Sequence, residues 1–266
     1  MREIVIKDWA HFSQLAVERG NNQRLFRGVR QENFKLVPKV GRPRFRDRKH
    51  NLEDEKEALE RFRRAARPHI AYDPPSLLAW MSIAQHHGLP TRLLDWTESP
   101  FIALYFAVQN GRAQTETRSI GSLTKAEARR SNDLKFWELA QQKRYLKSTK
   151  IQIKLDAAVY VVPIPGNTKT DTLDEELAFR EGSNEVRTYR PAHLSPRITV
   201  QKAVHTLHDN PVRSWRPAGS EKWLISSKLI IKFKLNLNLV GINEASLFPD
   251  LDGISNYYGW LYQRGM

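Results

Sequence analysis

The sequence predicts an α+β fold in which a mixed or antiparallel β-sheet core is flanked by several helices. Residues 157–163, AAVYVVP, are a β-branched run typical of a buried strand. Residues 228–237 alternate in polarity, which indicates an antiparallel strand with one apolar face. Between such runs, apolar residues recur at helical spacing. Strand and helix patterns therefore share one chain.

The first third of the chain supplies two strands and three helices. Residues 3–6 alternate like a short strand, and Asp8 can cap the helix that follows. Residues 25–28 form a short apolar run that ends in glycine, as a strand leaving the core does. A charged amphipathic helix is expected at residues 53–67, and Ser76 can cap another.

The remaining elements are set by apolar runs and prolines. Residues 92–97 predict a short buried strand, and Pro100 opens a helix that is apolar nearly all round, which is typical of a central helix. Polar residues 111–133 predict an exposed connection. A helix at 134–146, a strand at 197–207 and a final helix at 254–262 complete the order.

Length and composition indicate one soluble domain. The 266 residues show no repeat and no interdomain linker, and no run is apolar enough for a signal peptide or a membrane span. The absence of cysteine excludes disulfides, thiolate zinc sites and cysteine nucleophiles. We therefore expect a cytoplasmic protein. Its net charge of +14 favours an anionic partner such as nucleic acid, while an acidic protein partner or simple self-repulsion stays open.

The first candidate cluster is Phe26-Arg27-Gly28. An arginine at the end of a strand can fork onto a phosphate or carboxylate, and the glycine permits close backbone approach. The alternative is an arginine that holds a loop through an ion pair. These residues alone favour the alternative.

The second cluster lies in the run AQHHGLPTRLLDWTESP, residues 84–100. Neighbouring His86 and His87 do not share a face of a helix or strand, and no third ligand stands at the usual spacing, so no metal site is expected. His86, His87, Asp95, Trp96 and Thr97 could instead recognise a ligand's ribose and base in a cleft. A network that satisfies buried backbone groups is an equal alternative.

The third cluster combines Tyr189-Arg190-Pro191 with residues 197–201. On the expected strand, Arg197, Thr199 and Gln201 would share one face, which would line a cleft or be an ordinary solvated face. Glycine-rich phosphate loops, the G-x-S-x-G elbow and the H-E-x-x-H zinc motif are absent from the sequence.

Taken in order, these clusters resemble the FRG domain family. Phe26-Arg27-Gly28 resembles the motif that names it, residues 84–107 resemble its longest signature, and YRPAHLSPRITVQKAVHTLH (189–208) and SLFPDLDG (246–253) resemble its C-terminal signatures. The resemblance covers residues 22–262 as an FRG core, with residues 1–21 as a strand–helix extension of one domain. The family is similar in layout to ADP-ribosyltransferases, which implies a split β-sheet around an NAD-binding cleft.

The resemblance implies an NAD-dependent ADP-ribosyltransferase, with NAD as substrate and no metal. Arg27 would anchor phosphate or ribose, and Gln201 or Glu244 would act at the ribose or the acceptor in a reaction whose transition state is oxocarbenium-like. Contacts to NAD would come from two segments and Arg197. These residues are Phe26, Arg27, Gly28, His86, His87, Asp95, Trp96, Thr97 and Arg197.

The excess positive charge indicates that the acceptor is a nucleic acid, RNA ahead of single-stranded DNA. Cations around one aromatic residue would contact it, namely Arg42, Arg44, Phe45, Arg46, Arg48 and Lys49, with support from the arginines of residues 61–67. The family suggests a toxin of a toxin–antitoxin or antiphage system, with an antitoxin or chaperone protein as partner. An NAD glycohydrolase and a non-catalytic module that binds a nucleotide or phage component are the alternatives.

Overall fold

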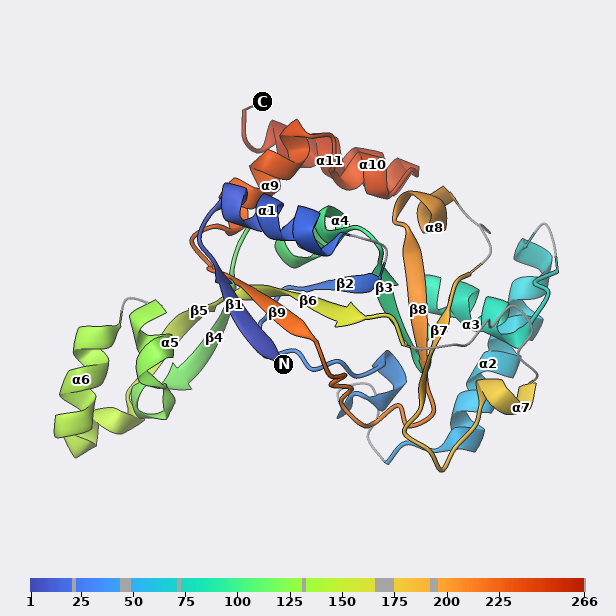
Figure 1. Cartoon of the computed structure of the whole chain (residues 1–266), viewed down its shortest axis with the longest axis horizontal. Helices are drawn as coiled ribbons and strands as arrows, with labels where there is room; N and C mark the ends of the chain where they lie inside the picture. Colours follow the sequence, from blue (N-terminus) through green and yellow to red (C-terminus); the bar gives the residue numbers. More distant parts are fainter. Residues whose placement is uncertain are drawn as a thin grey trace.

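The computed structural model describes residues 1–20, 23–43, 49–70, 73–130, 133–165, 175–191 and 196–265. In this part of the chain the main sheet has seven strands in the order β1-β9-β6-β2-β3-β8-β7 (Figure 1). Its strands are β1 Arg2–Ile6, β2 Arg24–Val29, β3 Leu93–Thr97, β6 Ala157–Pro163, β7 Val186–Tyr189, β8 Ala203–His208 and β9 Glu221–Ile225. β1 and β9 run parallel, and the other neighbours pair antiparallel. The mixed α+β class is confirmed.

A separate small unit is formed by β4 Gln114–Ser119 and β5 Lys150–Leu155, which pair antiparallel, with α5 Lys125–Arg130 and α6 Leu134–Gln142. It stands at one side of the molecule (Figure 1). The other helices are α1 Trp9–Arg19, α2 Leu52–Ala66, α3 Leu77–His86, α4 Pro100–Val108, α7 Glu175–Ala178, α8 Pro196–Val200, α9 Ile230–Leu239, α10 Glu244–Leu247 and α11 Leu251–Tyr262.

The main sheet is almost divided between β2 and β3. These two strands share the single residue pair Phe26 and Thr97, whereas β2 pairs with β6 from Arg24 to Val29. Beyond the shared pair the strands diverge, and Figure 1 shows β2 and β6 running across the view while β3 and β8 run steeply. The sheet therefore opens next to the first sequence cluster.

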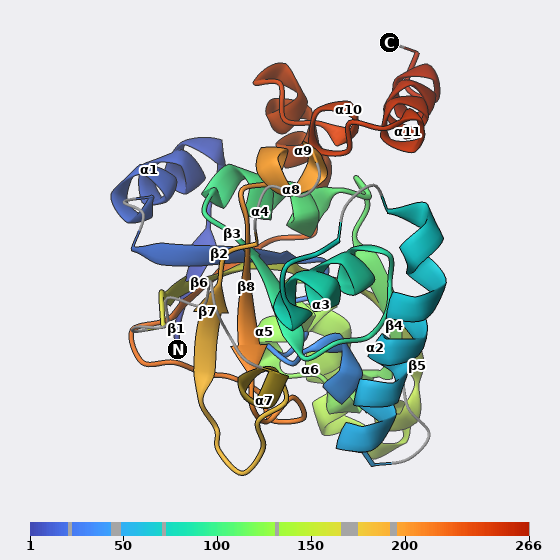
Figure 2. The same ribbon diagram turned by 90° about the vertical axis from the view of Figure 1, so that its right-hand side faces the viewer.

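Side-chain alternation gives this sheet two different faces. On one face, α1, α4 and α9 pack on the β2–β6–β9 half, and α2 and α3 pack on the β3–β8–β7 half (Figure 2). On the other face, Leu36 and Trp215 from two loops cover Leu94, Trp96 and their neighbours. We call these the helix face and the loop face.

Helix α4 is the centre of the helix face, as its all-round apolar sequence predicts. It begins at Pro100 after the Ser99 cap and lies directly on β2. A Cβ atom at Gly28 would stand 1.8 Å from the carbonyl oxygen of Ala103 and 2.6 Å from the amide nitrogen of Ala107. Gly28 therefore permits the close approach of α4 to β2, and it also lines the cavity described below.

The strand predicted at residues 228–237 is wrong, because this segment is the helix α9. The sequence IIKFKLNLNL alternates, but it also places Ile230, Phe233, Lys234 and Leu237 at helical spacing, and these are the residues that α9 buries. Both periods fit so short a run, and packing against α4 selects the helix.

Two further predictions need correction. Residues 197–207 are not one strand, because α8 covers Pro196–Val200 and β8 begins only at Ala203 after a turn. Arg197, Thr199 and Gln201 therefore do not share a strand face. Residues 111–133 are not merely an exposed connection, because they contain β4 and α5. Their apolar side chains, among them Ile120, Leu123 and Ala128, are buried in the core of the small unit.

Candidate functional site

A cavity of about 890 Å³ lies where the sheet opens between β2 and β3. Its wall takes residues from both faces of the sheet, including Phe106 and Gln85 on the helix face and Phe34 on the loop face. Five arginine and lysine side chains line it: Arg27, Arg30, Lys35, Arg42 and Arg197. The one carboxylate among its described lining residues is that of Asp95. The cavity therefore favours an anionic ligand.

Arg27 spans the opening of the sheet. Its Nη1 atom donates a hydrogen bond to the backbone oxygen of Asp95 at 2.5 Å and lies 3.8 Å from the Asp95 carboxylate. Burial lowers the pKa of Arg27, and the nearby Asp95 charge partly restores it. Arg27 thus joins the two halves of the sheet while its guanidinium lines the cavity, so the structural and the ligand-binding interpretations of this residue are compatible.

Asp95 is held by groups on three elements. Gln85 of α3 donates a hydrogen bond to its Oδ1, His205 of β8 approaches the same oxygen with Nδ1 at 3.2 Å, and Arg27 approaches Oδ2. Burial by itself would raise the pKa of Asp95, but His205, Arg27 and Gln85 outweigh it, and the pKa lies well below its ordinary value. The side chain is 57% exposed because it faces the open cavity, although protein surrounds it. Asp95 is thus an ionised, oriented carboxylate.

Ser82, His205 and Asp95 form a linear set of contacts. Ser82 Oγ lies 2.9 Å from His205 Nε2, and His205 Nδ1 faces Asp95. Ser82 is 2% exposed and His205 6% exposed, so the serine is remote from solvent while the aspartate is the accessible end. This is the reverse of a serine hydrolase, in which the serine must meet the substrate and the aspartate is buried. The serine and histidine therefore position the carboxylate.

Trp96 and Thr97 both line the cavity, and both also make hydrogen bonds within the protein. Trp96 is 3% exposed, and its indole N–H donates to Thr206 Oγ1 at 2.9 Å. Thr206 Oγ1 lies 2.9 Å from His208 Nε2, and burial followed by the charges of Arg27 and Arg92 lowers the pKa of His208 to about 3. Thr97 donates to the Gln201 backbone oxygen and accepts from the Ser99 amide. Its hydroxyl therefore shapes the cavity wall through the backbone.

The sequence also predicted four other side chains near this cavity. Arg197 lines it and stacks 4.1 Å over the Phe248 ring, and Gln201 lines it while its amide donates to the Leu247 backbone oxygen. His86 lines the cavity as well, and burial followed by the charges of Arg197 and His87 lowers the pKa of His86. His87 is exposed at the end of α3, with its ring centroid 5.1 Å from that of His86, and is not among the lining residues.

Glu244 lies outside the cavity. It opens α10 and borders a separate small hollow with Tyr105 and Lys234. Burial, together with the Glu244 charge, raises the pKa of Tyr105. The structure therefore brings Arg27, Asp95, Arg197 and Gln201 to one site but places Glu244 elsewhere.

The predicted nucleic-acid residues are only partly described. Arg44, Phe45, Arg46 and Arg48 lie outside the described residues. Arg42 lines the main cavity and donates to the Val37 backbone oxygen at 2.9 Å, and Lys49 borders a second, more open hollow beside Asp209. The two described members of this group therefore face different hollows.

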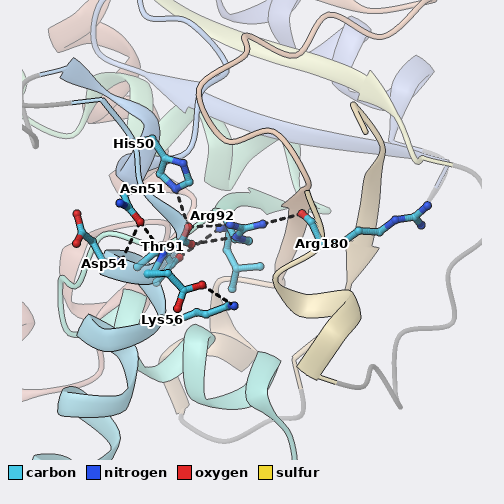
Figure 3. Close-up of polar contacts among 10 residues, drawn as sticks. His50, Asn51, Asp54, Lys56, Thr91, Arg92 and Arg180 are labelled. Atoms are coloured by element: carbon cyan, nitrogen blue, oxygen red, sulfur yellow. Dashed lines mark hydrogen bonds and ion pairs between the residues drawn. The ribbon is translucent and has the colours of Figure 1, made fainter. Parts of the chain in front are cut away.

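Arg92, which belongs to the second sequence cluster, is buried away from this cavity. It is fully buried and forks onto Glu55 of α2, with Nε to Oε1 at 3.0 Å and Nη2 to Oε2 at 2.9 Å. His50 lies 2.8 Å from the same carboxylate, and Arg92 also donates to the Arg180 backbone oxygen at 3.0 Å (Figure 3). Arg92, directly before β3, therefore links this strand to α2 through a buried ion pair. For this residue the structure supports the alternative of a structural polar network that the sequence left open.

Comparison with known protein families identifies an FRG domain at residues 22–116. This segment contains two of the four stretches that carry the resemblance, Phe26-Arg27-Gly28 and residues 84–107, and with them Arg27 and Asp95. The other two, residues 189–208 and 246–253, lie outside the match. No curated protein and no solved structure matches the chain. Among the described residues, no helix combines the length and the apolar character needed to cross a bilayer.

Sequence reasoning did not identify His205, Ser82 and Gln85 as site residues. His205 reaches Asp95 because β3 and β8 pair with these two residues opposite each other. No local sequence pattern predicts that register. Gln85 belongs to the second cluster and lies on the last turn of α3. Its place on this helix, directly before His86, is the sequence signal that could have identified it as a site residue. The cations Arg30 and Lys35 enter the site from a loop that follows β2.

Proposed function

We propose that this protein is an NAD-dependent ADP-ribosyltransferase that modifies nucleic acid, RNA in preference to single-stranded DNA, as a toxin of a toxin–antitoxin or antiphage system. The observation that carries the proposal is the cavity at the opening of the sheet, where five cationic side chains surround one oriented carboxylate. Its volume of about 890 Å³ falls in the range of sites for small molecules and cofactors. In this proposal an antitoxin or chaperone protein controls the activity.

The charges of the cavity are distributed in a way that suits a dinucleotide. Arg27, Arg30, Lys35 and Arg42 come from β2 and the loop after it, and Arg197 comes from α8. Guanidinium groups bind phosphate oxygens in pairs, so the cluster on and after β2 would hold the pyrophosphate. His86 and Asp95 line the same cavity as Arg197 and would face a ribose. The side chains present therefore fit NAD as a substrate.

Asp95 is the carboxylate in this site that would stabilise the transition state of the reaction. Bound NAD would supply a ribose whose bond to nicotinamide breaks as positive charge develops on the sugar. A carboxylate that stays ionised at neutral pH stabilises such charge, and Asp95 is ionised because of His205, Arg27 and Gln85. Ser82 and His205 fix its orientation. Asp95 thus takes the part that the sequence offered to Glu244.

The remaining predicted residues have supporting parts in this proposal. Arg27 would bind phosphate and keep the two halves of the sheet in register through the Asp95 backbone oxygen. Gln201 is tied to Leu247 and, through its own backbone oxygen, to Thr97. It would therefore help to fix the wall on the ribose side.

The test uses the whole chain and NAD labelled in its adenylate part, with and without RNA, single-stranded DNA or lysate protein. Label on RNA supports the proposal, and release of free ADP-ribose supports an NAD glycohydrolase. If neither is observed, the result supports a non-catalytic binding module. Arg27→Ala should abolish NAD consumption and weaken NAD binding measured by calorimetry. Arg27→Lys should retain part of the binding, because the charge remains while the fork is lost. NAD consumption unchanged in Arg27→Ala would refute the site.

A further inference from the structure

The small unit formed by β4, β5, α5 and α6 carries a disproportionate share of the positive charge. Residues 112–155 contain eleven lysines and arginines against four aspartates and glutamates, a net charge of +7, which is half of the +14 of the whole chain. The unit has its own core, built around Ile120, Ile153 and Ala140. A separately packed unit with this charge is suited to meet a polyanion.

One face of the β4–β5 ribbon carries two of these lysines and no carboxylate, whereas Glu116, which is also exposed, belongs to the other face. On β5, Ile151, Ile153 and Leu155 turn toward the core, and the alternate residues Lys150, Gln152 and Lys154 are exposed. On β4, the residues opposite these three are Ser119, Thr117 and Thr115. The outward face of the ribbon, residues 114–119 and 150–155, thus consists of two lysines, one amide and three hydroxyls, with no carboxylate.

This face has the chemistry of a phosphate-backbone contact. Lysines supply charge, while Ser, Thr and Gln side chains donate hydrogen bonds to phosphate oxygens without reading base identity. Lys150 and Lys154 are four residues apart on one strand, about 13 Å at roughly 3.3 Å per residue. A nucleic-acid strand, which repeats its charge along its length, can meet both lysines at once, and a single small anion cannot.

The ribbon is linked directly to the candidate site. Gln109 ends α4 and lines the main cavity, and β4 begins at Gln114, five residues later. The other end of the ribbon, Leu155, leads through one residue into β6, which pairs with β2 beside Arg27. Both ends of the unit therefore join the body at elements that form or adjoin the cavity.

We propose that the β4–β5 face binds the phosphate backbone of single-stranded RNA and presents it to the cavity. The proposal rests on the proposed function for its choice of RNA, because the cavity would have to receive an unpaired nucleotide. It gives the nucleic-acid partner a surface other than the basic residues between 42 and 49 that the sequence predicted.

The test is binding of a fluorescently labelled single-stranded RNA to the full chain without NAD, followed by anisotropy over a range of salt concentrations. Lys150→Gln with Lys154→Gln should weaken binding about tenfold near 0.15 M salt and reduce the slope of log affinity against log salt by about 1.4, since each phosphate contact to a single strand contributes about 0.7. Lys7→Gln with Lys232→Gln removes the same charge from two exposed positions outside the ribbon and the cavity, and should change affinity less than twofold. Both lysines of the ribbon pair are exposed, so thermal unfolding should be unchanged.

Equal effects of the two pairs would overturn the proposal, because they would show that net charge alone sets the affinity. If polyglutamate competes as strongly as RNA, the proposal is overturned in favour of an acidic protein partner. If duplex DNA binds more tightly than single-stranded RNA, the choice of single-stranded RNA as the partner is overturned. The two proposals also fail separately. RNA binding through the ribbon without NAD consumption would refute the enzyme, whereas NAD consumption with normal RNA binding by the ribbon variant would refute the ribbon.

Discussion

Replacing Glu55 by glutamine tests whether the arginine of the longest sequence signature is structural. Glu55 has 4% of its side chain exposed and Arg92 has none, and two hydrogen bonds of 3.0 and 2.9 Å join them. Glutamine keeps the shape and removes the charge, so the Arg92 cation stays buried without its counter-ion. Removal of one partner of a buried pair costs about 3–5 kcal/mol.

The lower end of that range applies to Glu55→Gln. Arg92 keeps its hydrogen bond to the Arg180 backbone oxygen and its stacking 5.2 Å from the Phe179 ring centroid. We therefore expect a loss of about 3 kcal/mol in the free energy of unfolding, which corresponds to a fall in Tm of roughly 6–12 °C for a chain of this size. Urea denaturation followed by circular dichroism measures it.

The matched control is Glu57→Gln on the same helix. Glu57 has 60% of its side chain exposed and pairs with Arg61 four residues on, at 2.6 Å. Such a pair contributes about 0.3–0.5 kcal/mol. A loss below 1 kcal/mol in Glu55→Gln, or equal losses in the two variants, would refute the assignment of Arg92 to the core.

Acid should have a related effect on the unmodified protein. Burial alone would raise the pKa of Glu55, but the hydrogen bonds from His50 and Arg92 outweigh it and lower the pKa below its ordinary value. A depressed carboxyl pKa gives stability that is present above the unfolded-state value of about 4.3 and is lost as pH falls through the folded-state value. The Glu55→Gln variant should lack this part of the pH dependence.

Two further pairs of substitutions test the site and its support. Asp95→Asn should lower NAD turnover on the order of 100-fold, while Glu244→Gln should have little effect because Glu244 lies outside the cavity; the reverse order would restore Glu244 as the acid. Gly28→Ala should destabilise the fold by about 3 kcal/mol, since the new Cβ would stand 1.8 Å from the Ala103 oxygen. Gly259→Ala on α11, where nothing lies within 4 Å, should be neutral or stabilising, and similar unfolding curves for the two alanine variants would contradict the packing described for β2 and α4.

Local signals predicted most of the individual elements. Asp8 and Ser76 cap the helices for which the sequence proposed them, because a cap depends on the few residues that follow it. The β-branched run at β6 and the apolar α4 were likewise found where expected. The incorrect predictions concern two kinds of segment. In α9 one sequence pattern fits both a strand and a helix, and in the β4–β5 unit a few buried apolar residues are scattered among many polar ones.

The sequence by itself determined that the chain is a strongly basic α+β protein, that residues 22–116 match the FRG domain, and that Arg27 and Asp95 lie in its two most distinctive runs. Only the tertiary structure decided which of the candidate residues meet. Asp95 faces His205 through the register of β3 and β8, and Arg27 reaches Asp95 because β2 and β3 part after one shared pair. Register and strand divergence depend on packing over the whole sheet, and no local stretch of sequence records them.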